Sequence, residues 1–247
     1  METENLRIFA CDMIQNAGIL LKLPQIAMTT AQMLLQRVYH TPNYTFEKYP
    51  LDVTAMAALF LAAKVEETPR KAREVIDVFV FLISTKFPRD IILDHSEHEG
   101  VREELITTER RLLKNLGFNL LSSYPHKIIV NYYHAMVRVL DPEHNVWRER
   151  DNQELLQIAW NYCNDSLRTN VFIKYSKEEV ACACIQMACE DTKMFFPKST
   201  DGKEWFWLFV KDSAQVEAAI EMIRNLYQSA KPDLNELRQH MFVARFQ

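Results

Sequence analysis

The sequence predicts an all-α protein, and three observations support this prediction. First, apolar residues recur at spacings of three and four along most of the chain, which is the period of an amphipathic helix. Second, the 247 residues include only 4 Gly and 9 Pro, which argues against a turn-rich β protein and against disorder. Third, residues 55–63 are nine consecutive apolar positions, five of them alanine, the residue with the highest helix propensity.

The alanine-rich stretch is expected to form the central helix of a bundle, because a helix that is apolar on all sides has to be buried. Pro50 and Asp52 suit its start, where a missing N–H is harmless and a negative charge meets the helix dipole. Thr68-Pro69 suits its end. The apolar run stops at the charged residues of Lys64–Glu67, which we call the lip of this helix.

Five helices are expected in the first half of the chain, with the alanine-rich helix third. By their apolar residues they lie at about 6–21, 26–38, 51–67, 70–87 and 101–116. Gly117 stands where a glycine commonly ends a helix. The polar stretch before Gly100, which includes His95 and His98, is expected to be a solvated loop.

The pattern begins again after a short linker at 119–124. Further helices are expected at about 125–140, 151–167, 177–189 and 216–226, and an aromatic segment at 204–209. Val171–Ile173 favours a strand but is too isolated to form a sheet. The small residues on the third helix of each half share one spacing: Ala55, Ala58, Ala62 and Ala181, Cys184, Ala188. The chain is therefore predicted to use one unit twice, over 5–118 and 125–230, followed by a tail at 231–247 with some helical pattern.

Nothing in the sequence indicates an enzyme, a metal site or a cofactor. Cys182, Cys184 and Cys189 lack the spacing of zinc ligands and are interpreted as buried small hydrophobic residues of a reduced, intracellular protein. The sequence shows no glycine-rich phosphate loop, no catalytic residue at a recognisable motif and no segment of transmembrane length. A net charge of −4 argues against direct binding of nucleic acid.

Two charged residues lie beside apolar stripes. Glu109 is four residues from both Leu105 and Leu113, and Lys64 is three residues after Leu61. One interpretation is that each charge belongs to the margin of the core, with its stem buried and its head in water. Alternatively, a partner protein covers both, and the loss of one would then cost about 2–5 kcal/mol. In the aromatic segment, Trp205 and Trp207 are either core anchors or a surface for a second partner.

The residues around the lip resemble the cyclin box. The resemblance is carried by Leu-Ala-Ala-Lys-Val-Glu-Glu at 61–67 and by the stretch from Glu109 to Phe118. Residues 6–28, 124–130 and 160–172 are similar to the cyclin L branch, whereas Lys198–Trp205 is similar to cyclin T. The resemblance covers about residues 5–230. The chain lacks the arginine–serine-rich tail usual in cyclin L and the substrate-docking run of cell-cycle cyclins.

The resemblance implies a tandem cyclin fold, with two five-helix bundles and a central third helix in each. It also implies a nuclear regulatory subunit that forms a heterodimer with a cyclin-dependent kinase and activates it in transcription or splicing. The kinase would be of the PITSLRE type, with other transcriptional kinases as alternatives. The residues that match the kinase interface of the family are Lys64, Glu109, Leu61, Val65, Leu113 and Phe118.

Two further expectations concern the second half and the class of function. The third helix there ends in Cys189-Glu190-Asp191, without a lysine, so only the first half is predicted to hold the kinase through this lip. The second half would support the first or meet other partners. The alternative function is a cyclin-fold adaptor of the transcription-factor-B type, which would bind protein or nucleic acid without activating a kinase.

Overall fold

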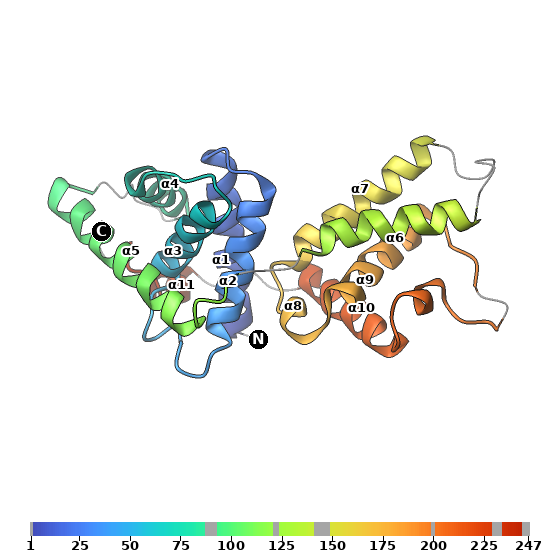
Figure 1. Cartoon of the computed structure of the whole chain (residues 1–247). Coiled ribbons are helices and arrows are strands. Elements are labelled where there is room, and N and C mark those ends of the chain that lie inside the picture. The colour runs from blue at the N-terminus through green and yellow to red at the C-terminus, as the bar shows by residue number, and fades with distance from the viewer. Residues whose placement is uncertain are drawn as a thin grey trace. The chain divides into compact units, whose positions relative to one another are not determined.

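The computed structural model describes residues 2–86, 93–120, 124–140, 149–198, 201–228 and 234–243, and in these ranges it contains helices and no strands (Figure 1). The prediction of an all-α protein is therefore confirmed. The chain divides into two compact units, each with its own hydrophobic core. Unit 1 comprises residues 1–122 and 229–247, and unit 2 comprises residues 123–228.

Unit 1 is a bundle of five long helices arranged around α3. Its helices are α1 Glu2–Leu20, α2 Gln25–Tyr39, α3 Leu51–Val65, α4 Ala72–Ser84, α5 His95–Asn115 and the short α11 Leu234–Gln239. Helix α3 contacts each of α1, α2, α4 and α5, and twelve of its fifteen residues are buried. Its five alanines are almost completely buried, so they let the neighbouring helices approach closely. The expected central position of this helix is confirmed.

Helix α5 begins earlier than the sequence pattern indicated. The expectation of a loop at His95 and His98 was wrong, because both residues lie in the first turn of α5. The turn is fixed by a capping box: the Asp94 carboxylate accepts from the backbone N–H of Glu97, and the Glu97 carboxylate accepts from the N–H of Asp94. Residues 88–92 of the predicted loop lie outside the described residues.

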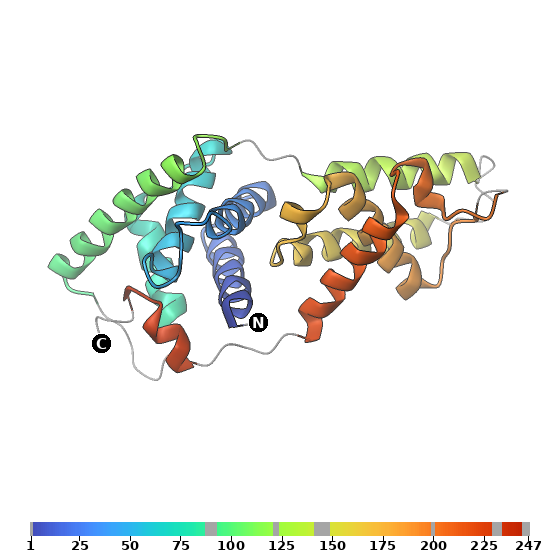
Figure 2. The ribbon, with the colours of Figure 1, turned by 90° about the horizontal axis from the view of Figure 1, so that it is seen from below.

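The C-terminal segment completes the core of unit 1. Leu237, Met241 and Val243 are buried in the same cluster as the apolar residues of α3. At the start of α3, the buried Asp52 carboxylate accepts from the backbone N–H groups of Phe242 at 2.8 Å and Val243 at 2.7 Å. Figure 2 shows α11 beside the other helices of unit 1. Residues 231–233 and 244–247 of the predicted tail lie outside the described residues.

Unit 2 repeats the arrangement around α9. Its elements are α6 Pro125–Leu140, α7 Glu149–Ser166, α8 Val171–Lys174, α9 Lys177–Thr192, the 3₁₀-helix η1 Trp205–Leu208 and α10 Ser213–Gln228. The run at 171–173, predicted to favour a strand, forms the single helical turn α8 instead, because the part of the chain that the structure describes contains no strand to offer backbone partners. Helix α9 contacts α6, α7 and α10 and is the buried centre of the unit. Residues 121–123 of the predicted linker lie outside the described residues.

Candidate partner-binding site

The lip of α3 is shaped by the way the helix ends. Glu67 adopts a left-handed conformation with φ +55°, and the backbone N–H of Thr68 donates to the carbonyl of Ala63 at 2.8 Å. This is the Schellman arrangement, which turns the chain sharply away from the helix axis. Lys64 therefore lies in the last turn of α3, at an open edge of the bundle.

The structure brings Lys64 and Glu109 together. The Lys64 ammonium donates to Oε1 of Glu109 on α5, and it lies 4.2 Å from the centre of the Phe60 ring. The Lys64 side chain is 41 % exposed, whereas that of Glu109 is only 11 % exposed. The pair therefore lies at the boundary of the core, with the carboxylate largely withdrawn from water and the ammonium still accessible. A burial of this kind makes the loss of either partner more damaging than at a fully exposed ion pair.

The apolar side chains near the ends of α3 and α5 differ in exposure. Val65 and Leu113 are partly buried against the core of unit 1. Phe118 is 70 % exposed, and it follows Gly117, whose φ of +59° ends α5 in a second Schellman turn. Leu61, in contrast, is buried at 5 % exposure and belongs to the bundle itself. Phe118, Val65 and Leu113 are thus the apolar side chains that a partner could cover.

Contacts from other helices hold the lip in place. The Thr30 hydroxyl on α2 donates to the Glu66 carboxylate at 2.7 Å. The Arg70 guanidinium donates to the backbone carbonyls of Leu21 at 3.0 Å and Lys22 at 3.1 Å, just after the end of α1. Arg70 thereby joins the segment after α3 to the segment after α1. The lip is a braced part of the bundle rather than a free loop.

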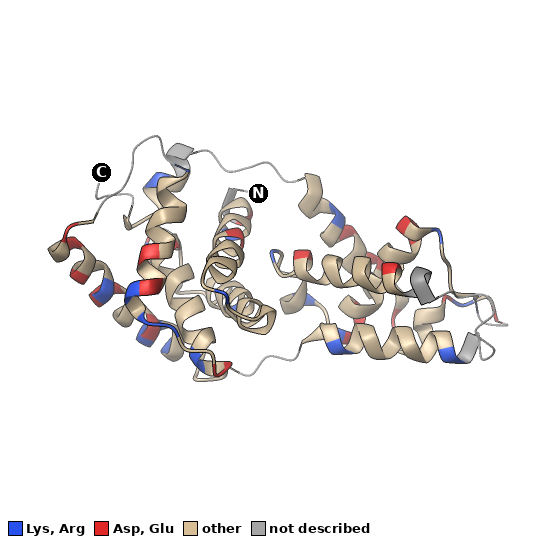
Figure 3. Ribbon diagram, turned by 90° about the horizontal axis from the view of Figure 1, so that it is seen from above, with Lys and Arg blue, Asp and Glu red and all other residues tan. Residues whose placement is uncertain are grey.

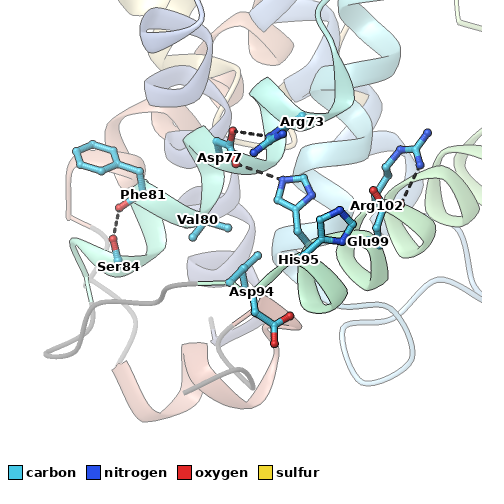
Figure 4. Close-up of a pocket in the computed structure, with 11 residues that line it drawn as sticks. Arg73, Asp77, Val80, Phe81, Ser84, Asp94, His95, Glu99 and Arg102 are labelled. Atoms are coloured by element: carbon cyan, nitrogen blue, oxygen red, sulfur yellow. Dashed lines mark hydrogen bonds and ion pairs between the residues drawn. The ribbon is translucent and has the colours of Figure 1, made fainter.

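A groove lies between α4 and the N-terminal part of α5, the helix that carries Glu109. It has a volume of about 680 Å³, and Figure 4 shows Asp77 and Phe81 of α4 on one side and His95, Glu99 and Arg102 of α5 on the other. Asp77 accepts from a ring nitrogen of His98 at 3.2 Å and lies 3.9 Å from Arg73. Because α5 rises about 1.5 Å per residue, the groove begins about 10 Å from Glu109 along the helix axis. Sequence reasoning missed this groove, although Asp94 and Glu97 have capping-box spacing and signalled the early start of α5.

The two tryptophans of η1 lie in different environments. Trp205 is buried at 3 % exposure, and its indole N–H donates to the Gln186 side chain at 2.9 Å. Trp207 is 46 % exposed, with the Lys203 ammonium 3.8 Å from its ring centre. Only Trp207 is therefore available at the surface, and a role in binding a second partner stays a prediction.

The described residues also bear on the other site chemistries considered. All five cysteines are free and buried, and burial raises the pKa of Cys189 to about 12, so this thiol is not a nucleophile at neutral pH. No group of residues suited to a metal ion occurs in the described ranges, and no helix there is long and apolar enough to cross a bilayer. In the view of Figure 3, basic and acidic residues are interspersed along the helices of both units.

Comparison with known proteins identifies the family. The family model described as "Cyclin, N-terminal domain" matches residues 1–121, and that described as "Cyclin-T2-like, C-terminal domain" matches residues 134–229. Cyclin-L1 of Gallus gallus is 42 % identical over 239 residues, which are 96 % of this chain and 41 % of that protein. Cyclin-L2 of Mus musculus is 40 % identical over 245 residues, which are 98 % of this chain and 44 % of that protein.

The chain belongs to the cyclin family. The resemblance to cyclin L, with cyclin T-like features in the second half, is thereby confirmed. This cyclin spans less than half the length of these two curated relatives.

The fold of this cyclin also matches solved structures. A chain of the yeast RNA Pol II CTD kinase CTDK-1 complex has a TM-score of 0.67 at 20 % identity, over 98 % of this cyclin and 74 % of that chain. A chain of the CAK complex from Chaetomium thermophilum bound to ATP-γ-S has a TM-score of 0.66 at 14 % identity, over 97 % and 73 %. At these identities the matches establish the fold, and they agree with the predicted tandem cyclin architecture.

Proposed function

We propose that this cyclin is a non-catalytic regulatory subunit that binds and activates a cyclin-dependent kinase through the lip of α3. The observation that carries the proposal is the Lys64–Glu109 pair, which is half-withdrawn from water. The exposed Phe118 follows the helix that carries Glu109, so this end of the unit offers a partner both a polar anchor and apolar area, as protein interfaces do. The family membership supports the same conclusion.

The mechanism follows from differential affinity. A kinase is active when the glutamate of its mobile helix pairs with its catalytic lysine, and this helix has more than one position. A cyclin that binds the active position more tightly shifts the population toward it by that difference in affinity. Lys64 would donate to backbone carbonyls of the kinase, Glu109 would hold the ammonium in place and accept a kinase N–H, and Val65, Leu113 and Phe118 would cover apolar side chains of the mobile helix.

The test is a double substitution with a matched control. Lys64→Ala combined with Glu109→Ala should weaken kinase binding by about 2–5 kcal/mol and abolish activation at micromolar concentrations. Lys177→Ala combined with Glu178→Ala removes another Lys–Glu pair, which is partly exposed on unit 2, and should leave binding unchanged. Titration calorimetry and a kinase assay with purified partners measure both effects. Equal binding and activation by the two double variants would show that the lip is not the kinase interface.

The identity of the kinase requires a separate experiment. We expect a PITSLRE-type kinase, since the relatives at about 40 % identity are cyclins L1 and L2, and other transcriptional kinases are the alternatives. Affinity capture from native extract, with wild type and the double variant compared side by side, should enrich one kinase with the wild type alone. A fluorescent fusion should concentrate in the nucleus. Capture of DNA with steep salt dependence, and no kinase stimulation, would favour the adaptor function instead.

A further inference from the structure

The central helices of the two units end in the same way, so we also call the end of α9 the lip of unit 2. Helix α9 ends in the same Schellman turn as α3: Lys193 has φ +56°, and the N–H of Met194 donates to the carbonyl of Cys189 at 3.1 Å. Each of these residues is 126 positions after its counterpart in unit 1, and so are the small residues Ala181, Cys184 and Ala188. With the same offset, Glu190 of α9 occupies the position of Lys64 in α3.

The partner of Glu190 completes the comparison with unit 1. Arg224, on the last helix of unit 2, donates to the Glu190 carboxylate, as Lys64 does to Glu109. In both units an ion pair therefore joins the end of the central helix to a neighbouring helix, α5 in unit 1 and α10 in unit 2, but the signs are reversed. In unit 1 the cation is on the central helix, whereas in unit 2 the anion is there.

The surroundings of the unit 2 pair are also acidic. The Tyr162 hydroxyl donates to the Asp191 carboxylate, and the Tyr227 hydroxyl donates to Asp165 at 2.8 Å. The rings of Tyr162 and Tyr227 lie edge to face, with centroids 6.2 Å apart. The carboxylates of Glu190 and Asp191 thus lie with the guanidinium of Arg224 in one cluster, whereas Asp165 and the cation of Arg168 lie near Tyr227. In each of the bonds described, the carboxylate uses one of its two oxygens, so the other can receive a further donor.

A cavity lies at this position. It has a volume of about 270 Å³ and is lined by Tyr162, Met187, Glu190, Asp191, Arg224, Tyr227 and Gln228. The Arg224 side chain is 52 % exposed and the Glu190 side chain is 39 % exposed. Glu190 can therefore exchange Arg224 for another cation without opening the bundle. A guanidinium stacks on tyrosine rings and forms paired hydrogen bonds with carboxylates.

We propose that this acidic lip of unit 2, formed by Glu190, Asp191, Tyr162 and Tyr227, is a second docking site, which takes an arginine side chain from a basic segment of a partner protein. This partner would bring a positive charge to the lip of unit 2. The partner of the unit 1 lip instead meets the Lys64 ammonium at the equivalent position. The arginine would displace Arg224 from Glu190, pair with Glu190 and Asp191, and lie against the ring of Tyr227. Because the site involves no residue of unit 1, it does not depend on the proposed kinase contact.

The test uses the full chain and a peptide probe. The probe is a short fluorescein-labelled peptide in which arginines alternate with glycine–serine pairs, and its neutral counterpart has citrulline at each arginine. Fluorescence anisotropy at low salt should show saturable binding of the arginine peptide and none of the citrulline peptide. Glu190→Gln combined with Asp191→Asn should weaken binding about tenfold, as expected for two partly exposed charge pairs. Equal binding of the two peptides would overturn the proposal.

Three control variants distinguish a loss of peptide binding at this site from effects of net charge and of unit stability. Glu154→Gln combined with Glu217→Gln removes the same charge from exposed positions of unit 2 and should leave binding unchanged. Arg224→Gln removes the competing cation and should strengthen binding about threefold, an effect that misfolding cannot produce. Lys64→Ala combined with Glu109→Ala should also bind the peptide normally. If the Glu154 and Glu217 control weakens binding as much as the lip variant, or if Arg224→Gln weakens it, the arginine is not bound at this lip.

Discussion

Replacement of Asp52 by alanine is expected to detach the C-terminal segment from unit 1. The Asp52 carboxylate is fully buried and holds three backbone N–H groups, those of Val53, Phe242 and Val243. Oδ1 accepts from Val53 and Phe242, and Oδ2 accepts from Val243. The alanine variant loses all of these bonds. Asp52→Asn loses chiefly the bond from Val243, because an amide N–H₂ that takes the place of Oδ2 opposes another donor.

The magnitude follows from the two bonds that reach the C-terminal segment. A hydrogen bond to a charged acceptor contributes about 1.5–3 kcal/mol, so the two together contribute about 3–6 kcal/mol to unit 1. Burial raises the pKa of Asp52, opposed by the backbone N–H donors, which shows that holding the charge inside the core has a cost. Removal of the carboxylate also removes this cost. We therefore expect a loss near the lower end, about 3 kcal/mol for Asp52→Ala, and about half of that for Asp52→Asn.

The sequence provides a built-in way to assign the loss to one unit. All four tryptophans lie in unit 2, so tryptophan fluorescence in urea reports on unit 2, whereas circular dichroism reports on both units. Asp52→Ala should lower the midpoint of the transition seen only by circular dichroism, and leave the fluorescence transition in place. Glu103→Ala removes an exposed acid from α5 of unit 1 and should change neither by more than about 0.5 kcal/mol.

A truncated chain tests whether Asp52 acts through the C-terminal segment. In a chain that ends at Gln228, the segment that Asp52 holds is gone, so Asp52→Ala should cost no more than about 1 kcal/mol, the range of a helix-capping residue. Hydrogen exchange of the Phe242 and Val243 amides in the full chain should accelerate strongly in the alanine variant. If Asp52→Ala costs the same in both chains, the two effects are additive and Asp52 does not act through the C-terminal segment.

Three further predictions concern single residues. Gly117→Ala should destabilise unit 1 by about 1–2 kcal/mol, because Gly117 has a φ of +59°. Gly100→Ala, at an exposed position within α5, should instead stabilise unit 1 by about 0.5–1 kcal/mol. Thermal melting of both variants measures the two effects. Burial lowers the pKa of His126, opposed by its contact with Asn164, so the folded state favours the neutral ring. The stability of unit 2 should therefore fall as the pH drops below about 6.5. His126→Gln should flatten this pH dependence in urea titrations followed by tryptophan fluorescence. Phe118→Ala should weaken kinase binding by more than 1 kcal/mol while leaving the melting temperature nearly unchanged, because the ring is exposed; a changed melting temperature with unchanged binding would refute this role.

Much of the helical architecture was readable from local patterns. The alanine-rich run predicted the buried centre of unit 1, and Gly117 predicted the end of α5, because both act through propensities that need no distant partner. The start of α5 was misjudged because polar residues such as His95 carry no apolar periodicity, although the cap at Asp94 marks the turn. Helix existence was thus easier to predict than helix boundaries.

The candidate site was predictable only in part. The family resemblance assigned Lys64 and Glu109 to one kinase interface, and the structure shows that they form an ion pair. The role of Asp52 was out of reach, because its partners Phe242 and Val243 are 190 and 191 residues away and contribute backbone groups, which no side-chain pattern reveals. The exposure of Phe118 and the burial of Leu61 likewise follow from packing rather than from spacing.

The contribution of residues 234–243 to unit 1 has a consequence for synthesis on the ribosome. Unit 1 begins at the N-terminus, but its last core residue, Val243, is made only after the whole of unit 2. At about 5–20 residues per second, the 121 residues from 123 to 243 take about 6–24 s to appear. During that interval the N-terminal helices have no C-terminal segment to cover them, so unit 2 can finish folding first. The nascent first unit would therefore be a substrate for chaperones that bind apolar surfaces.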